Sequence, residues 1–372
     1  MKTRLQSVIA ALSVLAAAPV FAQSLDLTVH QVGVSIGDSR RITGLRLNFR
    51  DDRLEEVNGI NATIWAPYRD PRGVVNGAAL GLPVTGARRI NGLAAGIFGV
   101  GADESITGIG IGGVGLGTGE DFKGIGVGGI GIGTGRDVRG LVIGGIGAGV
   151  GEDVNGIAIG GIGVGAGRDV TGAVIGGIGA GVGGDLKGVA VGGIGIGAGQ
   201  DVRGVLIGGI GAAAGQDMKG IAIGGIGVGA GQNVKGLTIA GVGIGAGQDM
   251  TGVQVAGVGI GAGGTLKYLS IAGAGIGASR IEGVAAAAAV GGENVRGLVI
   301  APVYFKITDD GMMRGVNLSA YNDVRGTQRG LAIGLFNYAR NLDGVQLGIL
   351  NYARNKRSAK LLPIINYSRG NR

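Results

Sequence analysis

A 16-residue repeat constrains the fold of this chain more than any other feature of its sequence. From Gly108 the chain runs GIGIGGVGLGTGEDFK, GIGVGGIGIGTGRDVR and GLVIGGIGAGVGEDVN, and the period continues without insertion to Lys267. So short a period does not suit helical repeats and matches one coil of a β-solenoid. We therefore predict an all-β fold, a parallel two-sheet β-solenoid in which each unit forms one coil.

The local pattern of the unit, an apolar residue, a polar residue and then Gly, extends beyond the perfect array. It occurs upstream at Val57-Asn58-Gly59 and downstream at Leu342-Asp343-Gly344, where the spacing varies. We predict about 20 coils in all. The expected segments are irregular N-terminal coils with a cap over 23–107, the perfect array over 108–267, and irregular C-terminal coils with a cap over 268–372.

Unit positions, numbered from the first Gly, differ in how much they vary. Positions 2 and 4 are nearly always apolar, as in Ile157 and Ile159, whereas position 3 varies from Ala158 to Gln254 and Arg46. We expect positions 2 and 4 to face inward and position 3 to face outward. The alternation breaks at the glycine pair of positions 5 and 6 and at the polar positions 13 to 16, which predicts two strands and two corners per coil.

An antiparallel outer-membrane β-barrel is the alternative fold. The charge-free stretch Gly156–Gly167 is long enough for a spanning strand, which needs about 9–11 residues. Two features favour the solenoid: aromatic residues are only 4%, few for two girdles, and position 13 alternates in sign. Position 13 is Glu120, Arg136, Glu152 and Arg168 in successive units. In a parallel stack these side chains lie about 4.8 Å apart, so opposite charges become neighbours.

Composition argues against most catalytic chemistry. Of 372 residues 88 are Gly, none is Cys and one is His, which leaves little basis for thiol chemistry, zinc clusters or His-based catalysis. The chance GxGxxG strings do not open a helix, and no GK[ST] motif follows them. We expect a protein that is not an enzyme, with no catalytic residue, no cofactor and no metal. Nucleic acid is not an expected partner, because the net charge of +8 is modest.

Position 14 is Asp in most units of the array. We expect each carboxylate to accept backbone N–H bonds in a turn, with Lys or Arg at position 16 as counter-charge. A calcium ladder is the alternative, since Gly-Ala-Gly-Gln-Asp-Val resembles part of the calcium-binding nonapeptide GGxGxDxUx. The period of 16 in place of nine favours the turn. The Asp51-Asp52 pair is expected in a solvated turn.

The first 22 residues have the features of an export signal. Lys2 and Arg4 precede an apolar segment over 8–20, and small residues lead to Ala22. We therefore expect a signal peptide over 1–22 and an exported protein, located in the periplasm, in the outer membrane or at the cell surface.

Three Asn-Tyr-x-Arg motifs, beginning at Asn337, Asn351 and Asn366, close the chain. Because Tyr and Arg are enriched at binding surfaces, we expect stacked motifs to form an interaction patch, with a structural cap as the alternative. The candidate residues are Tyr338, Arg340, Tyr352, Arg354, Tyr367 and Arg369.

A family resemblance appears in the same region. The segments GLAIGLFNYA from Gly330 and GVQLGILNYA from Gly344 resemble the G-V-Q-[IL]-G-L-x-N-x-A unit of bacterial surface-repeat proteins. The likeness covers about 30 residues and implies a protein of the bacterial envelope or cell surface.

These observations predict a non-enzymatic, exported structural or surface-interaction repeat protein; an outer-membrane β-barrel or pore is the alternative. An ice- or mineral-binding surface is a third function, but the Thr arrays expected for it are absent from the sequence. The partner is unidentified. The candidates are an envelope glycan, a lipid headgroup and self-association through the glycine face of the second strand.

Overall fold

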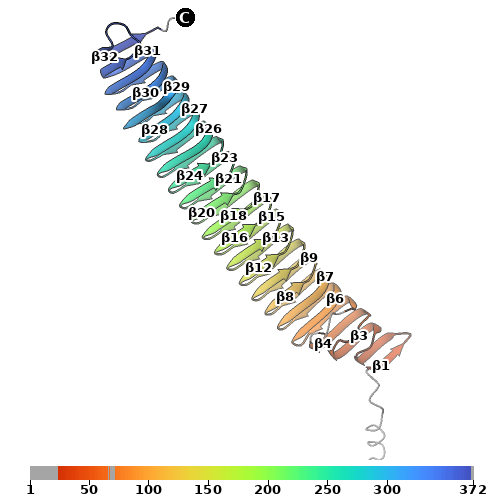
Figure 1. Ribbon diagram of the computed structural model, residues 1–372. Helices are drawn as coiled ribbons and strands as arrows, with labels where there is room; N and C mark the ends of the chain where they lie inside the picture. Colours follow the sequence, from red (N-terminus) through yellow and green to blue (C-terminus); the bar gives the residue numbers. More distant parts are fainter. Residues whose placement is uncertain (1–23, 66, 68–71, 370–372) are drawn as a thin grey trace, which may run out of the picture. The chain divides into compact units, whose positions relative to one another are not determined.

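The computed structural model describes residues 24–65, 67 and 72–369; the expected signal peptide over 1–22 lies outside them. The predicted fold is confirmed: the chain is all-β, with 76% strand and about 19 turns of a β-solenoid. It divides into two compact units, Met1–Gly145 and Ile146–Arg372, and Figure 1 shows the stacked coils of each. The described residues include no helix long and apolar enough to cross a membrane.

Unit 1 contains the first eleven strands. They are β1 (Ser24–Val29), β2 (Val32–Gly37), β3 (Arg41–Arg50), β4 (Glu56–Trp65), β5 (Val74–Gly81), β6 (Val84–Gly96), β7 (Gly99–Gly112), β8 (Gly115–Thr118), β9 (Asp121–Gly128), β10 (Gly131–Thr134) and β11 (Val138–Gly144).

Unit 2 contains the remaining strands. They are β12 (Gly147–Val150), β13 (Val154–Gly160), β14 (Gly163–Ala166), β15 (Val170–Gly176), β16 (Gly179–Val182), β17 (Leu186–Gly192), β18 (Gly195–Ala198), β19 (Val202–Gly208), β20 (Gly211–Ala214), β21 (Met218–Gly224), β22 (Gly227–Ala230), β23 (Val234–Ala240), β24 (Gly243–Ala246), β25 (Met250–Ala256), β26 (Gly259–Ala272), β27 (Gly275–Ala286), β28 (Ala289–Ile300), β29 (Tyr304–Leu318), β30 (Tyr321–Ile333), β31 (Phe336–Ala353) and β32 (Leu361–Ser368).

Within each unit the coils pair in parallel and in register. β13 pairs with β15 and β12 pairs with β14, so each coil contributes a seven-residue strand to one sheet (the long sheet) and a four-residue strand to the other (the short sheet). The barrel alternative is therefore wrong, because its neighbouring strands would run antiparallel. The sign alternation at position 13 gives ion pairs between adjacent coils, Glu120 with Arg136 at 3.5 Å and Glu152 with Arg168 at 2.9 Å.

Antiparallel strands stand at the first and last coils. β1 pairs antiparallel with β2, and β31 pairs antiparallel with β32. Next to the first of these pairs, Arg46 is fully buried and forms ion pairs with Asp38, at 2.7 Å, and with Asp51. Asp51 is thus a buried counter-ion, not the solvated turn residue expected from the sequence, because a buried guanidinium requires paired charges.

The expected orientation of the long-sheet side chains is wrong. Ala158 at position 3 is fully buried, whereas Ile157 at position 2 is 42% exposed and Ile159 is half-buried. The core consists of positions 15 and 3 of the long sheet and positions 9 and 11 of the short sheet, as in Val154 and Val164. The uniformly apolar positions 2 and 4 lie on the outside of the sheet.

Position 3 faces position 9 across a thin core, and in four consecutive coils of unit 2 the two vary reciprocally in size. At Gly110 the space of a missing side chain is filled by Leu116 of the same coil, which shows that positions 3 and 9 oppose each other. In consecutive coils of unit 2 the opposed pairs are Ala158 with Val164, Val174 with Ala180, Ala190 with Ile196, and Leu206 with Ala212. A large residue on one sheet is met by a small one on the other, which keeps the core close-packed.

Glycines of the unit fall into two classes. At position 1, Gly172 has φ +132° and a Cβ there would overlap the carbonyl oxygen of Gly156 in the adjacent coil. At position 10, a Cβ on Gly165 would meet no atom within 4 Å. Coil stacking favours glycine in the first class, where Tyr268 at φ +83° is an exception, and no internal contact requires glycine in the second.

Alanine substitutions separate these classes. We expect Gly172→Ala to destabilise unit 2 by more than about 1 kcal/mol, because it combines steric overlap with an unfavourable φ. Gly165→Ala should be neutral or stabilising by about 0.5–1 kcal/mol, since Gly weakens strand interiors. Denaturant unfolding of the two variants measures the difference, and equal effects would contradict the assignment.

Candidate functional site

The main surface feature is a set of outward apolar rows, which we call the apolar face: unit positions 2 and 4 of the long sheet and position 7 at the following corner. Its members in unit 2 that are 37–53% exposed, within the array coils and the coil that follows them, are Ile146, Ile157, Ile162, Ile175, Ile178, Val189, Ile194, Ile210, Ile221, Ile226, Ile239, Val242, Val253, Val258 and Ile271. No charged residue occupies positions 2, 4 or 7 of these coils.

Among the irregular coils, the row of position 4 and the row of position 7 lie on the two sides of a groove. In unit 2 an open apolar groove of about 810 Å³ is lined on one side by Ile300, Leu318 and Ile333 and on the other by Leu335 and Ile349. Unit 1 has a similar groove of about 450 Å³. Both grooves lie among the irregular coils outside the array.

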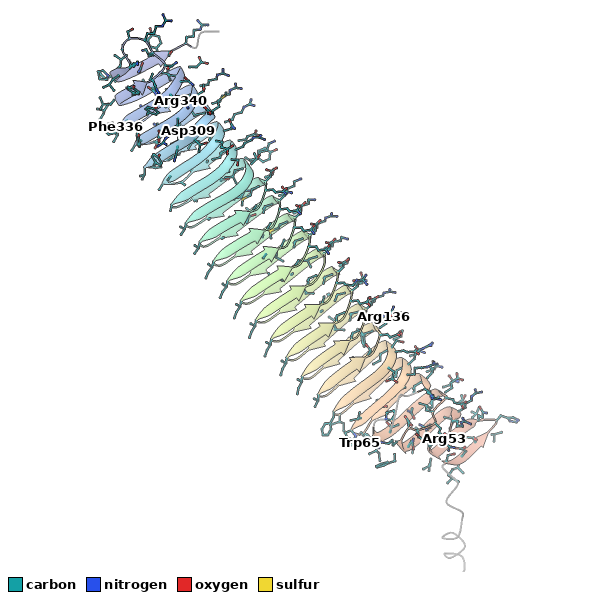
Figure 2. All side chains as sticks on the ribbon, viewed as in Figure 1. Arg53, Trp65, Arg136, Asp309, Phe336 and Arg340 are labelled. Carbon is teal, nitrogen blue, oxygen red and sulfur yellow. The ribbon has the colours of Figure 1, made fainter. Side chains whose placement is uncertain are left out.

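The charged edge of the coil lies away from the apolar face. Figure 2 shows Trp65 on the edge of unit 1 opposite Arg136, and Phe336 on the edge of unit 2 opposite Asp309 and Arg340. Each coil thus has one apolar edge and one charged edge.

The short sheet carries glycines on its outer surface. Positions 8 and 10 are Gly163 and Gly165 in one coil, and both face outward. In the last coils these rows hold side chains instead: position 10 becomes Lys306, Asp323 and Tyr338. The outer surface of the short sheet is therefore flat in the array and becomes aromatic and charged after it.

The position 14 carboxylates accept backbone N–H bonds as expected, but the donors lie in the adjacent coil and not in the same turn. The Asp169 carboxylate accepts the backbone N–H of Asp185 at 2.8 Å, and the same contact repeats from Asp201 to Asp217 at 3.1 Å. Cations at position 16 lie within ion-pair distance, as in Lys219 with Asp217 at 3.6 Å. Within residues 24–65, 67 and 72–369, no three His, Cys, Asp or Glu side chains cluster as metal ligands.

Asp217 provides a pH-dependent test of this turn. The Asn233 side chain, its backbone N–H and Lys219 together lower the pKa of Asp217. A carboxyl whose pKa is lower in the folded state stabilises the fold above its unfolded pKa of about 3.9, and that contribution is lost as pH falls through the folded pKa.

We expect Asp217→Ala to destabilise the fold by about 1 kcal/mol at pH 7 and by less at pH 3, whereas Asp217→Asn retains an acceptor and costs less at pH 7. Denaturant unfolding at both pH values is the measurement. A cost for Asp217→Ala that does not change with pH would contradict the ladder.

The candidate patch of the three C-terminal motifs is only partly assembled. Tyr338 and Tyr352 stack with ring centroids 5.6 Å apart and an interplanar angle of 6°. Tyr367 lies on the antiparallel strand β32, where it pairs with Val345, so the three motifs do not continue as one parallel ladder. Arg369 follows this strand and is exposed.

The arginines of the first two motifs line a polar hollow of about 550 Å³. Arg340 forms an ion pair with Asp310 at 3.4 Å, and Arg354 lies at the same hollow. The other lining residues are Asp309, Tyr321, Asp323, Arg325 and Tyr338. Burial, followed by the charge of Asp323, raises the pKa of Tyr321.

The Asn of each motif has a role that the sequence did not predict. Asn322 donates to Asn337 at 2.6 Å, and Asn337 donates to Asn351 at 2.6 Å, all inside the core. Asn366 donates to the Asn351 carbonyl at 3.1 Å and extends this chain onto the antiparallel strand. The motif therefore combines a buried amide ladder with outward Tyr and Arg side chains.

No protein-family model matches the chain, and no curated protein or solved structure matches it either.

Proposed function

We propose that this chain is a non-enzymatic, exported structural and surface-interaction repeat protein that assembles through its apolar face. The observation that supports this most is the recurrence of half-exposed Ile and Val along the array, as in Ile157 and Ile162. Soluble monomers rarely leave contiguous apolar patches larger than a few hundred Å² in water.

The exposed area is in the range of a stable interface. Burying an Ile or Val is worth about 1.5–3 kcal/mol at about 25 cal/mol/Å², or roughly 60–120 Å² per side chain. With 37–53% of each exposed, the 15 side chains named above leave roughly 400–800 Å² in water. A standard protein interface buries about 800 Å² per partner.

A second copy of this chain is the partner we propose. Its rows have the same spacing of about 4.8 Å, so the side chains of one copy fit between those of the other, as in stacked sheets. A two-fold arrangement uses the same face on both copies and closes on itself. The neighbouring glycine rows of the short sheet leave the adjoining surface flat and allow close approach.

Export to the bacterial envelope is part of the proposal. It rests on the basic and apolar segments within residues 1–22 and on the likeness of the C-terminal coils to bacterial surface-repeat units. The absence of Cys and the single His of the sequence support a role without catalysis.

Threonine substitutions in the corner row test the assembly. We expect Ile178→Thr, Ile194→Thr and Ile210→Thr together to weaken association by about 100-fold or more, because each loses about 1 kcal/mol of apolar burial while keeping a β-branched side chain. Sedimentation velocity over a concentration series measures the dissociation constant. The matched control is Lys187→Thr, Arg203→Thr and Lys219→Thr. These cations lie at position 16, near the beginning of strands β17, β19 and β21 and away from the corner row. The control variant should associate like the original chain.

Two outcomes would overturn the proposal. In the first, the original chain remains monomeric at high concentration. In the second, the two triple variants associate with equal dissociation constants. Flotation with phosphatidylcholine vesicles that is lost only in the Ile variant, without association in solution, would replace the second copy by a lipid surface.

A further inference from the structure

The excess positive charge of the described chain lies in its last coils. Residues 268–369 contain 12 Lys and Arg against 6 Asp and Glu, whereas the array over 108–267 contains 9 against 10. In the array, Asp and Glu balance the charge of Lys and Arg, whereas in the last coils they do not. The difference arises at positions 14 and 16 of the coil.

In the array four of the seven cations at position 16 are paired with the Asp at position 14 of the same coil. Lys123 lies 3.2 Å from Asp121, and Arg203 lies 3.6 Å from Asp201. After the array, the strand register places Arg280, Asn294 and Met312 at position 14 of three successive coils, and none of these residues is acidic. The acid that normally neutralises position 16 is thus missing from three consecutive coils.

Position 16 is Glu282 in the first of these coils and Arg in the other two. Arg296 and Arg314 occupy adjacent coils at the same register, which places like charges side by side. Among the residues that the structure describes, the side chains of Arg280, Arg296 and Arg314 make no hydrogen bond or ion pair. The acids nearest to them in the position 16 row already form ion pairs: Glu282 lies 3.8 Å from Lys267, and Asp343 lies 3.2 Å from Arg329.

The three arginines border one hollow of about 340 Å³, which we call the arginine hollow. Its lining residues are Arg280, Glu282, Asn294, Val295, Arg296, Met312 and Arg314. Three arginines from three coils therefore line one surface depression, together with the carboxylate of Glu282. A like-charged group of this kind is stabilised by an anion that bridges it.

We propose that the arginine hollow binds phosphate groups. The guanidinium fork matches the oxygens of phosphate bidentately, and three forks from adjacent coils suit a multiply charged anion better than a single carboxylate. The Asn294 side chain adds a neutral donor at the border. The phosphate comes either from a free polyphosphate or from a phospholipid headgroup. This proposal does not depend on the apolar face.

Calorimetric titration of the purified full chain with sodium tripolyphosphate, and flotation with phosphatidylglycerol vesicles, distinguish the two sources. We expect Arg296→Gln with Arg314→Gln to weaken binding by about tenfold or more, because two charge-assisted contacts are lost. The matched control is Arg203→Gln with Lys219→Gln, which removes the same charge from position 16 where each cation has an Asp partner. It should bind within about twofold of the original chain.

The outcomes are separable. Tripolyphosphate binding that is lost in the Arg296 and Arg314 variant supports the site with a free ligand; vesicle binding alone, lost in the same variant, supports it with a lipid headgroup. Equal weakening by both double variants would reduce the effect to net charge and overturn the proposal, as would the absence of binding to either probe. The unfolding midpoint gives a second measurement: relief of repulsion should leave the Arg296 and Arg314 variant at least as stable as the original chain.

Discussion

The parallel, in-register ladder between coils is the interaction on which the rest of this structure depends. It places every residue about 4.8 Å from the residue of the same unit position in the next coil. Residues at one unit position therefore form a continuous row along the stacked coils. The position 1 glycines follow directly, because Gly172 lies against the carbonyl of Gly156 where no Cβ fits. The ion pair of Glu152 with Arg168 follows as well, since the ladder brings position 13 of adjacent coils within 2.9 Å.

The thin core explains why so much apolar surface is left outside. Two sheets from a 16-residue coil enclose few inward positions, and one of these, position 11, is mostly Ala, as in Ala166. The larger side chains at positions 2 and 7 have no internal space to fill. Their half-exposure is therefore a consequence of the coil geometry, and it gives the apolar face its length and regularity. Each added coil extends the face by the same increment.

Much of the fold could be predicted from the sequence, because the period, the corners and the sign alternation depend only on spacing. The inward and outward faces could not be obtained from apolarity alone, because both faces of the long sheet are apolar. The reciprocal sizes of Ala158 with Val164 and of Val174 with Ala180 carry the missing signal, since only opposed positions need to compensate in volume. A uniform row of Ile is therefore not by itself a sign of the core in this coil.

The candidate sites were predicted less well than the fold. Stacking of Tyr338 on Tyr352 matches the expected repetition of the motif, but the reversal of β32 removes Tyr367 from that stack. The repeat period in the sequence does not reveal that the chain reverses direction in the last coil. The arginine hollow was missed because it is defined by an absent Asp at position 14. That absence is recognised only after strand register aligns Arg280 with Asn294 and Met312 across bulges that break the 16-residue count.

Thiol accessibility along one strand tests the central claim, that position 3 faces inward and positions 2 and 4 face outward. The sequence contains no Cys, so single replacements of Ile157, Ala158 and Ile159 each provide one thiol in β13. Labelling rates are measured at a dilution at which the protein sediments as a monomer. We predict rapid labelling at 157 and 159 and strong protection at 158. Protection at 157 and 159 with rapid labelling at 158 would contradict the account and reverse the two faces of the long sheet.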